Sequence, residues 1–283
     1  MYNIKVLLFT NDNDKGLLRL LDSMPKFLRS NLYIFDDNSK YGIDSSLANV
    51  IQQNSSNLGL FANMFTAIST YVDPIDFVLV LQDDVQFVCE VSQEMMDEYC
   101  QFMINKGLDE LDLRYMRSTG YSRYLHKNVV LDNDSYINKD YPYTDIGLWK
   151  GSSLLNLLLP VIDTINQTDF KSTSVDWGKE VWIGKQLGSS FRSRLHKNPI
   201  IAHTPFPDYR YSNPMTLLYG ALSSIMPKEF KPLTISEYEK FRKRPLSILP
   251  IDFLFLRTKP NSRLFFFPVQ PGLRNFKSLL KHP

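Results

Sequence analysis

The chain has 283 residues, of which 43% are hydrophobic and 22% charged, a composition typical of a globular protein with a sizeable core. It shows no signal-peptide pattern and no apolar run of the about 18 residues that a membrane-spanning helix needs. Two cysteines, Cys89 and Cys100, are too few for a disulfide framework or a zinc site. We therefore expect a cytoplasmic protein.

The net charge of +2 is unevenly distributed along the chain. Residues 228–283 carry twelve Lys or Arg against four Asp or Glu, which leaves a net charge of −6 in residues 1–227. The basic segment also holds the apolar clusters Phe253–Leu256 and Phe265–Phe267. We interpret it as a C-terminal basic/aromatic extension that either contacts an anionic membrane surface or packs on the body with a solvated basic rim.

Segments with strand and helix patterns alternate in the first 90 or so residues. We expect strands at Ile4–Thr10, Leu32–Phe35, Val50–Gln53 and Phe77–Leu81, and helices at Lys15–Leu28 and Leu60–Tyr71. This alternation predicts an α/β fold with a mostly parallel sheet flanked by helices on both faces.

Polar residues follow each of these predicted strands. They are Thr10-Asn11, Asp36-Asp37-Asn38, Asn57-Leu58-Gly59 and Asp83-Asp84. Parallel strands bring their carboxyl ends to the same edge of a sheet, where ligands bind in open α/β folds. The sequence therefore predicts a ligand site along this edge.

The acid pair Asp83-Asp84 is the most informative of these groups, because it directly follows the apolar run Phe77–Leu81. Burying two like charges is expensive, so we expect both carboxylates at the exposed end of the strand. Paired carboxylates in such a place suit Mg²⁺ or Mn²⁺ shared with ligand phosphates. The alternative interpretation is that both aspartates cap a turn.

The pattern is weaker after Ser92. We expect helices at Glu94–Met103 and Asp176–Leu187, strands at Leu111–Met116, Tyr136–Ile137 and Ile200–Ala202, and a turn at Gly147–Gly151 that leads into a helical, leucine-rich run to Leu159.

The motifs of the first half resemble those of nucleotide-sugar glycosyltransferases of the GT-A fold, particularly family 2. They are Asp36-Asp37-Asn38-Ser39, Asn57-Leu58-Gly59 followed by Ala62-Asn63, and the metal motif Gln82-Asp83-Asp84. The resemblance covers about residues 1–90 and implies a GT-A type, Rossmann-like domain at 1–227. Its nucleotide-sugar-binding half would be 1–90 and its acceptor-binding half 91–227.

The resemblance also implies a divalent metal and a donor site. Asp84 would bind Mn²⁺ or Mg²⁺, Asp83 would share the metal or bind the donor ribose, and His203 would be a further metal ligand. Either Asp36 or Asp37 would accept a hydrogen bond from the base or ribose. Together the residues expected to hold the donor are Thr10, Asn11, Asp36, Asp37, Asn57, Gly59, Asn63 and Asp83.

An inverting glycosyltransferase needs a general base that deprotonates the acceptor hydroxyl. The segment Lys179–Leu187 resembles the acceptor-facing helix of the family and offers Glu180 as that base. Asp176, four residues earlier on the same predicted helical face, is the alternative base. Both acids could instead belong to a solvated helix face. The resemblance to family 2 implies that the configuration of the transferred sugar is inverted rather than retained.

We therefore expect a glycosyltransferase that moves a sugar from a nucleotide sugar, UDP-linked by preference, onto a polysaccharide or glycolipid, as a cytoplasmic protein peripheral to the membrane. A nucleotidyltransferase is disfavoured, because its basic phosphate loop is replaced by the acidic Thr10–Asp14. A catalytically degenerate GT-A domain that binds a glycan or partner remains an alternative, because Gln82 takes the place of the first aspartate. No recognition motif accompanies the basic extension, so we expect no nucleic-acid partner.

Overall fold

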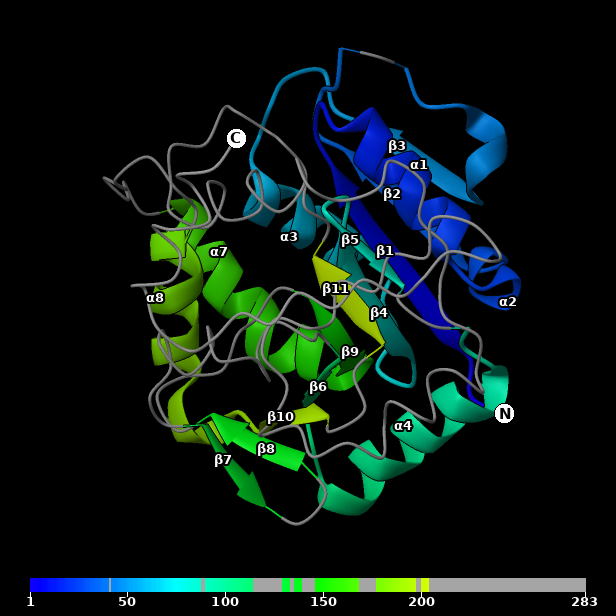
Figure 1. Ribbon diagram of the computed structural model, residues 1–283. Coiled ribbons are helices and arrows are strands. Elements are labelled where there is room, and N and C mark those ends of the chain that lie inside the picture. Colours follow the sequence, from blue (N-terminus) through cyan, green and yellow to red (C-terminus); the bar gives the residue numbers. More distant parts are fainter. Residues whose placement is uncertain are drawn as a thin grey trace, which may run out of the picture.

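The computed structural model describes residues 1–40, 42–87, 90–113, 129–132, 135–138, 146–167, 177–196 and 200–203. The expectations for Asp176 and for the extension at 228–283 lie outside these residues. Nine strands of the described part form one sheet in the order β3-β2-β1-β4-β9-β6-β10-β8-β7. Helices cover both faces of this sheet (Figure 1).

The strands of the large sheet are β1 (Ile4–Thr10), β2 (Leu32–Asp36), β3 (Val50–Gln53), β4 (Phe77–Gln82), β6 (Glu110–Asp112), β7 (Val129–Asp132), β8 (Ser135–Asn138), β9 (Gly147–Lys150) and β10 (Ser193–His196). A separate two-stranded sheet is formed by β5 (Val85–Phe87) and β11 (Ile201–His203). The α-helices are α1 (Asp14–Ser23), α2 (Lys26–Arg29), α3 (Leu60–Tyr71), α4 (Gln93–Lys106), α6 (Gly151–Ser153), α7 (Leu159–Gln167) and α8 (Trp177–Leu187). Short helical turns are η1 (Ser45–Leu47), η3 (Leu154–Leu158) and η4 (Gly188–Ser190).

The first four strands of the chain, β1 to β4, lie side by side and pair in parallel. Next to them β9 runs antiparallel to both β4 and β6, while β10 pairs in parallel with β6. Since β8 is antiparallel to β10 and β7, only β8 and β9 oppose the common direction among the nine described strands of the large sheet. The predicted mostly parallel sheet is thus confirmed.

Alternate residues of the central strands enter two hydrophobic cores, one on each face of the sheet. Val6 and Leu79 face a core that includes apolar side chains of α1, α2 and α4. Leu7 and Val78 face the other core, which includes side chains of α3, η3, α7 and α8. Figure 1 shows the corresponding layers, with α1 and α4 on one side of the sheet and α3, α7 and α8 on the other. The period-2 alternation expected of strands therefore decides which helices each side chain meets.

The predicted helix at Lys15–Leu28 is wrong at its C-terminal end. The α1 helix ends at Ser23, and a separate turn, α2, begins at Lys26. Pro25 lies between them, and a proline disfavours helical backbone in the residue before it. The Met24 backbone accordingly has ψ 132°.

The predicted turn at Gly147–Gly151 is also wrong, because Gly147–Lys150 forms β9 between β4 and β6. Gly147 lacks a side chain where one would collide with the carboxylate of Glu110, since a Cβ there would lie 2.5 Å from the Glu110 Oε1 atom. The glycine serves close packing in a buried strand rather than a turn.

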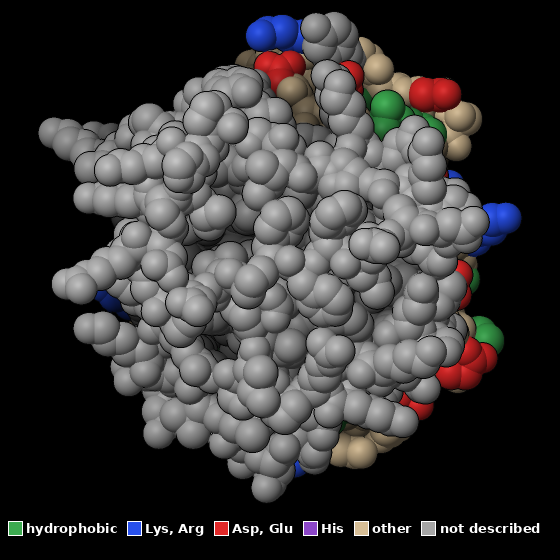
Figure 2. Space-filling model, viewed as in Figure 1, with side chains coloured by type: hydrophobic (Ala, Val, Ile, Leu, Met, Phe, Trp, Pro, Cys, Tyr) green, Lys and Arg blue, Asp and Glu red, His purple; other side chains and the backbone are tan. Residues whose placement is uncertain are grey.

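The strands and helices predicted at Glu94–Met103, Leu111–Met116, Tyr136–Ile137, Asp176–Leu187 and Ile200–Ala202 agree with α4, β6, β8, α8 and β11 to within a few residues, whereas β7 and β10 were not predicted and the leucine-rich helical run continues through α7 to Gln167. The strand predicted at Leu111–Met116 is β6 and starts one residue earlier, while residues 114–116 lie outside the described part. None of the described helices has the length and apolar character to cross a bilayer. Figure 2 shows Asp and Glu side chains interspersed with Lys and Arg along the described rim of the molecule on the side of α1 and α2.

Candidate functional site

The polar residues that follow β1, β2 and β4 lie at one edge of the sheet, as predicted. Thr10 stands beside Asp36 in the β1–β2 pair, and Phe9 stands beside Gln82 in the β1–β4 pair. Two backbone hydrogen bonds continue these pairs past the strand ends, from Asp37 N to Thr10 O (2.9 Å) and from Asp83 N to Phe9 O (3.1 Å). The acid pairs of β2 and β4 are therefore held on either side of the β1–α1 loop.

The Asp83 carboxylate is anchored to the start of this loop. Its Oδ2 atom accepts hydrogen bonds from the Thr10 hydroxyl (2.7 Å) and from the Asn11 backbone N–H (3.1 Å). Thr10 is buried, so its hydroxyl is directed at Asp83 rather than at solvent. One oxygen of Asp83 is consequently committed to the protein.

Burial and, to a lesser extent, the neighbouring charge of Asp84 together raise the pKa of Asp83 to about 7, against the opposing effect of the hydrogen bonds from Thr10, Asn13 and Asn11. Desolvation and like-charge repulsion both disfavour the charged form of a carboxyl group. The expectation that both carboxylates are exposed at the end of the strand is therefore met only in part, because Asp83 and Asp84 are half-buried. A divalent cation beside them would offset both effects. The site therefore has the electrostatic character of a place that accepts positive charge.

The pKa of Asp83 predicts a pH dependence of metal binding. Below about pH 7 the carboxyl is protonated in the metal-free protein, and a nearby cation disfavours that proton, so binding releases it. The raised pKa also affects the stability of the metal-free fold. Protonation of Asp83 contributes to the free energy of unfolding at acidic pH, and this contribution is lost as the pH rises through about 7. We expect Mn²⁺ affinity to rise by about tenfold from pH 6 to pH 8, as measured by electron paramagnetic resonance of free Mn²⁺. Equal affinities at the two pH values would contradict this coupling.

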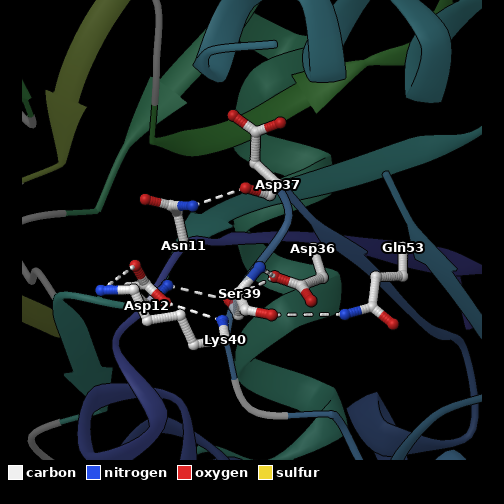
Figure 3. Close-up of polar contacts among 7 residues, drawn as sticks. All are labelled: Asn11, Asp12, Asp36, Asp37, Ser39, Lys40 and Gln53. Carbon is white, nitrogen blue, oxygen red and sulfur yellow. Dashed lines mark hydrogen bonds and ion pairs between the residues drawn. The ribbon is translucent and has the colours of Figure 1, made fainter. Parts of the chain in front are cut away.

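The Asp37 carboxylate holds the segment that precedes α3. Its Oδ1 atom accepts hydrogen bonds from Leu58 N (2.7 Å) and Asn54 Nδ2 (3.1 Å), and its Oδ2 atom accepts one from Gly59 N (2.7 Å). Asp37 is almost fully buried. Figure 3 shows its carboxylate directed away from Asp36 and from the β1–α1 loop. With three donors in place, this carboxylate retains little capacity to accept further hydrogen bonds.

Replacement of Asp37 by asparagine is expected to destabilise the fold. The amide presents one N–H₂ group to donors that now meet carboxylate oxygens, so at least one buried N–H loses its acceptor. We expect the free energy of unfolding to fall by about 2–3 kcal/mol in urea denaturation. Asp22→Asn, at an exposed position of α1, is the matched control and should change it by less than about 0.5 kcal/mol. Equal urea midpoints for Asp37→Asn and the control would show that these bonds contribute little.

The turn Asn57-Leu58-Gly59 forms as predicted. Gly59 has φ 84° and ψ 158°, a conformation that side-chain-bearing residues rarely adopt, and it is the N-cap of α3. Its N–H is shared between Asp37 and the Asn57 side chain (3.1 Å). Asn63, buried in the first turns of α3, accepts a hydrogen bond from the Asn54 amide. Asn57, Gly59 and Asn63 thus belong to one network with Asp37.

A second set of contacts joins the β1–α1 loop to the loop after β2 (Figure 3). Asn11 Nδ2 donates to Asp37 O (2.5 Å), and Asp12 N donates to the Ser39 hydroxyl (2.8 Å). Asp36 accepts hydrogen bonds from both the backbone and the hydroxyl of Ser39, so the first acid of the β2 pair is bonded to its own turn. These bonds hold the two loops together at the sheet edge.

The three remaining candidates lie in the second half of the chain. Antiparallel pairing of β11 with β5 places His203 opposite Val85, the residue after Asp84. Glu180 lies in α8, whose Ile183 and Leu187 are buried in the core beneath α3 and α7. The side chains of His203 and Glu180, and the whole of Asp176, lie outside what the structure describes.

The donor set at the end of β4 fits a hard divalent cation. Two adjacent carboxylates supply the oxygen ligands that Mg²⁺ and Mn²⁺ prefer. The pKa of Asp83 is raised by burial and by the charge of Asp84, so a nearby cation would stabilise its charged form. Among side chains that the structure describes, no three His, Cys, Asp or Glu residues gather closely enough to form a metal site by themselves. A cation held by Asp84 would therefore share its coordination with ligand phosphates or with His203.

Asn13, at the start of α1, was not among the predicted site residues. Asn13 caps the helix by accepting a hydrogen bond from Gly16 N (3.2 Å), and its Nδ2 lies 3.4 Å from the backbone oxygen of Asp83. An Asn or Asp before an apolar helical run is a recognised N-cap signal, so Asn13 could have been found. The contact with Asp83 could not, because it joins residues 70 positions apart.

No protein-family model and no curated protein matches the chain. Among solved structures, it is similar to S. aureus TarS (16% identity, TM-score 0.46), covering 73% of this chain and 37% of that one. It is also similar to GalNAc-T7 with UDP, GalNAc and Mn²⁺ (10% identity, TM-score 0.48), and this match covers 86% of this chain and 50% of that one. A third similar structure is Mycobacterium tuberculosis glucosyl-3-phosphoglycerate synthase with Mn²⁺, UDP-glucose and phosphoglyceric acid (12% identity, TM-score 0.42). This match covers 79% of this chain and 76% of that one.

The chain thus spans about half or less of the length of the first two structures. Since the identities are below 25% and the TM-scores below 0.5, these likenesses do not transfer the ligands of those proteins to this chain.

Proposed function

We propose that the chain is a GT-A type glycosyltransferase that moves a sugar from a UDP-sugar onto a polysaccharide or glycolipid acceptor, with inversion and with Mn²⁺ or Mg²⁺. The observation that carries the proposal is the meeting of three sequence-distant groups at one sheet edge. They are the β1–α1 loop, the Asp36-Asp37 turn and the Asp83-Asp84 turn, joined by the hydrogen bonds of Thr10 and Asn11.

Each group has a task in such a transfer. The rim formed by Asn11, Asp12 and Ser39 would support the nucleotide base. Of the two predicted acceptors for the nucleoside, Asp36 is the one we propose, because the Asp37 carboxylate already accepts three hydrogen bonds from its own chain. Asp84 would hold the cation, assisted by His203. When bound, a divalent cation offsets the negative charge that develops on a diphosphate leaving group. Asp83 would orient this turn through its bonds to the β1–α1 loop.

The general base that deprotonates the acceptor hydroxyl would come from α8, on the face of the sheet that carries α3 and α7. Position 180 lies in α8, three residues before the buried Ile183, which anchors this helix in the core. We assign Glu180 as the general base and keep Asp176 as the alternative.

We also propose that residues 228–283, which carry net charge +8, bind an anionic membrane surface and bring the enzyme to a lipid-linked acceptor. We expect the full chain to sediment with vesicles containing phosphatidylserine at low salt and to be released at about 0.5 M salt, where charges are screened over a few ångströms. Equal sedimentation with neutral vesicles would exclude this electrostatic mode.

A degenerate GT-A domain that binds a glycan or partner is the second candidate. Asp37 is occupied by three donors of its own chain, and one oxygen of Asp83 is occupied by Thr10 and Asn11. Such self-satisfied carboxylates are what a module without a donor substrate would retain for stability alone.

The two candidates differ in an assay that needs no knowledge of the acceptor. The protein is incubated with UDP-, GDP- and CMP-linked sugars and Mn²⁺, and the slow release of nucleotide by transfer to water is followed. The transferase proposal expects release from UDP-sugars that stops when the metal is chelated. Absence of release from every donor, in folded protein, would favour the binding module.

A further inference from the structure

The acid turn after β4 is contacted from two sides. On the carboxylate side, Thr10 and Asn11 hold Asp83 Oδ2. On the backbone side, the first turn of α1 packs against the carbonyl oxygen of Asp83. The position of Asp84, the next residue, therefore depends on both contacts.

Gly16 allows the close approach on the backbone side. A Cβ at this position would lie closer than 3.0 Å to both Asp83 O and the Asn13 side chain. Its φ is not in the left-handed region, so the helix backbone itself would accept alanine. Alanine is better than glycine in a helix by about 1 kcal/mol, so the glycine is explained by space and not by backbone conformation. The atom in the way at Asp83 belongs to the main chain and cannot rotate aside.

Asn13 links the same two elements by polar contacts. Its Oδ1 accepts from Gly16 N (3.2 Å), which caps α1, and its Nδ2 donates to Asp83 O (3.4 Å). One side chain thus ties the start of the helix to the acid turn. A serine at this position would preserve the cap and lose the donor to Asp83.

We propose that Asn13 and Gly16 are positioning residues that set the place of the Asp83-Asp84 turn and thereby its affinity for the divalent cation. The inference rests on the proposed function, because it presumes that Asp84 holds that cation. Neither residue is proposed as a ligand of the cation. Both contact the backbone oxygen of Asp83, whereas Thr10 contacts its carboxylate.

The test compares three variants of the full chain. Gly16→Ala introduces the clash, and Asn13→Ser removes the donor while it keeps the cap. Gly42→Ala is the matched control, since a Cβ at Gly42 meets nothing within 4 Å and its φ is not left-handed. Mn²⁺ affinity is measured by electron paramagnetic resonance with and without UDP, and thermal stability is measured for each variant.

We expect Gly16→Ala and Asn13→Ser each to weaken Mn²⁺ binding by about tenfold, which is the lower end of the effect seen for residues that orient metal ligands. The Mn²⁺ affinity of Gly42→Ala should equal that of the wild type. A purely structural role would lower the melting temperature and leave the Mn²⁺ affinity of the folded protein unchanged. Should wild type bind Mn²⁺ and both variants bind it equally well, the inference is overturned and the proposed function stands. Should wild type and Gly42→Ala fail to bind Mn²⁺ even with UDP, the proposed function fails, and the inference with it.

Discussion

Replacement of Asp84 by asparagine is expected to lower Mn²⁺-dependent affinity for UDP by about 100-fold or more, because it removes the metal ligand itself and not a group that orients it. Asp84 is the ligand that the resemblance to GT-A glycosyltransferases implies, while the Oδ2 atom of Asp83 accepts two hydrogen bonds from the β1–α1 loop. Asparagine keeps the size of the side chain and removes its charge. The fold should therefore persist while the cation is lost.

The affinity is measured by calorimetric titration of UDP with and without Mn²⁺. Asp22→Asn, an equivalent change at an exposed position of α1, is the control and should bind as wild type does. If Asp84→Asn bound UDP with the same dependence on Mn²⁺, the cation would not be held at the end of β4.

Replacement of Glu180 by glutamine is expected to reduce the rate of sugar transfer by about 10²–10⁴-fold and to leave UDP binding unchanged. The amide cannot take the proton of the acceptor hydroxyl, whereas it preserves the shape of the side chain. The α8 helix is held in the core by Ile183 and Leu187, so a polar replacement at position 180 should not displace it.

The measurement is the turnover number with a saturating donor, alongside calorimetry of UDP binding. Lys185→Gln, at an exposed position of the same helix, is the control. Full activity in Glu180→Gln would exclude Glu180 as the base, and a loss in Asp176→Asn would then assign that role to Asp176.

The strands of the first half were predictable because each apolar run ends in a polar group. The bounds of β1 and β3 match the predictions, and β2 and β4 are one residue longer. The end of α1 was missed although Pro25 signals it, since apolar spacing alone was followed to Leu28. Local patterns thus identify elements well and their ends less well.

The second half was harder to predict because the roles of its glycines and acidic residues depend on packing against residues that are distant in the sequence. Gly147 resembles a turn residue in the sequence, yet in β9 it makes room for the carboxylate of Glu110. Glu110 and Asp112 are fully buried in β6, where polar residues are uncommon. Their environment is created by β9 and β10, which follow much later in the chain.

The site was predictable as a set of residues and not as a set of bonds. The meeting of Thr10, Asp36 and Asp83 follows from parallel strands that end together. The Asp37 carboxylate accepts hydrogen bonds from Leu58, Gly59 and Asn54. These bonds form because the segment before α3 folds back toward Asp37. Such bonds between loops have no periodic signal in the sequence.

The most direct test of the account is calorimetric titration of the wild-type chain with UDP, GDP, CDP and CMP, each with and without Mn²⁺. The account predicts that UDP binds, and that its affinity falls by at least tenfold when Mn²⁺ is withheld. Absence of binding by all four nucleotides, in protein shown to be folded, would contradict it and leave the sheet edge as a site for a glycan or a protein partner.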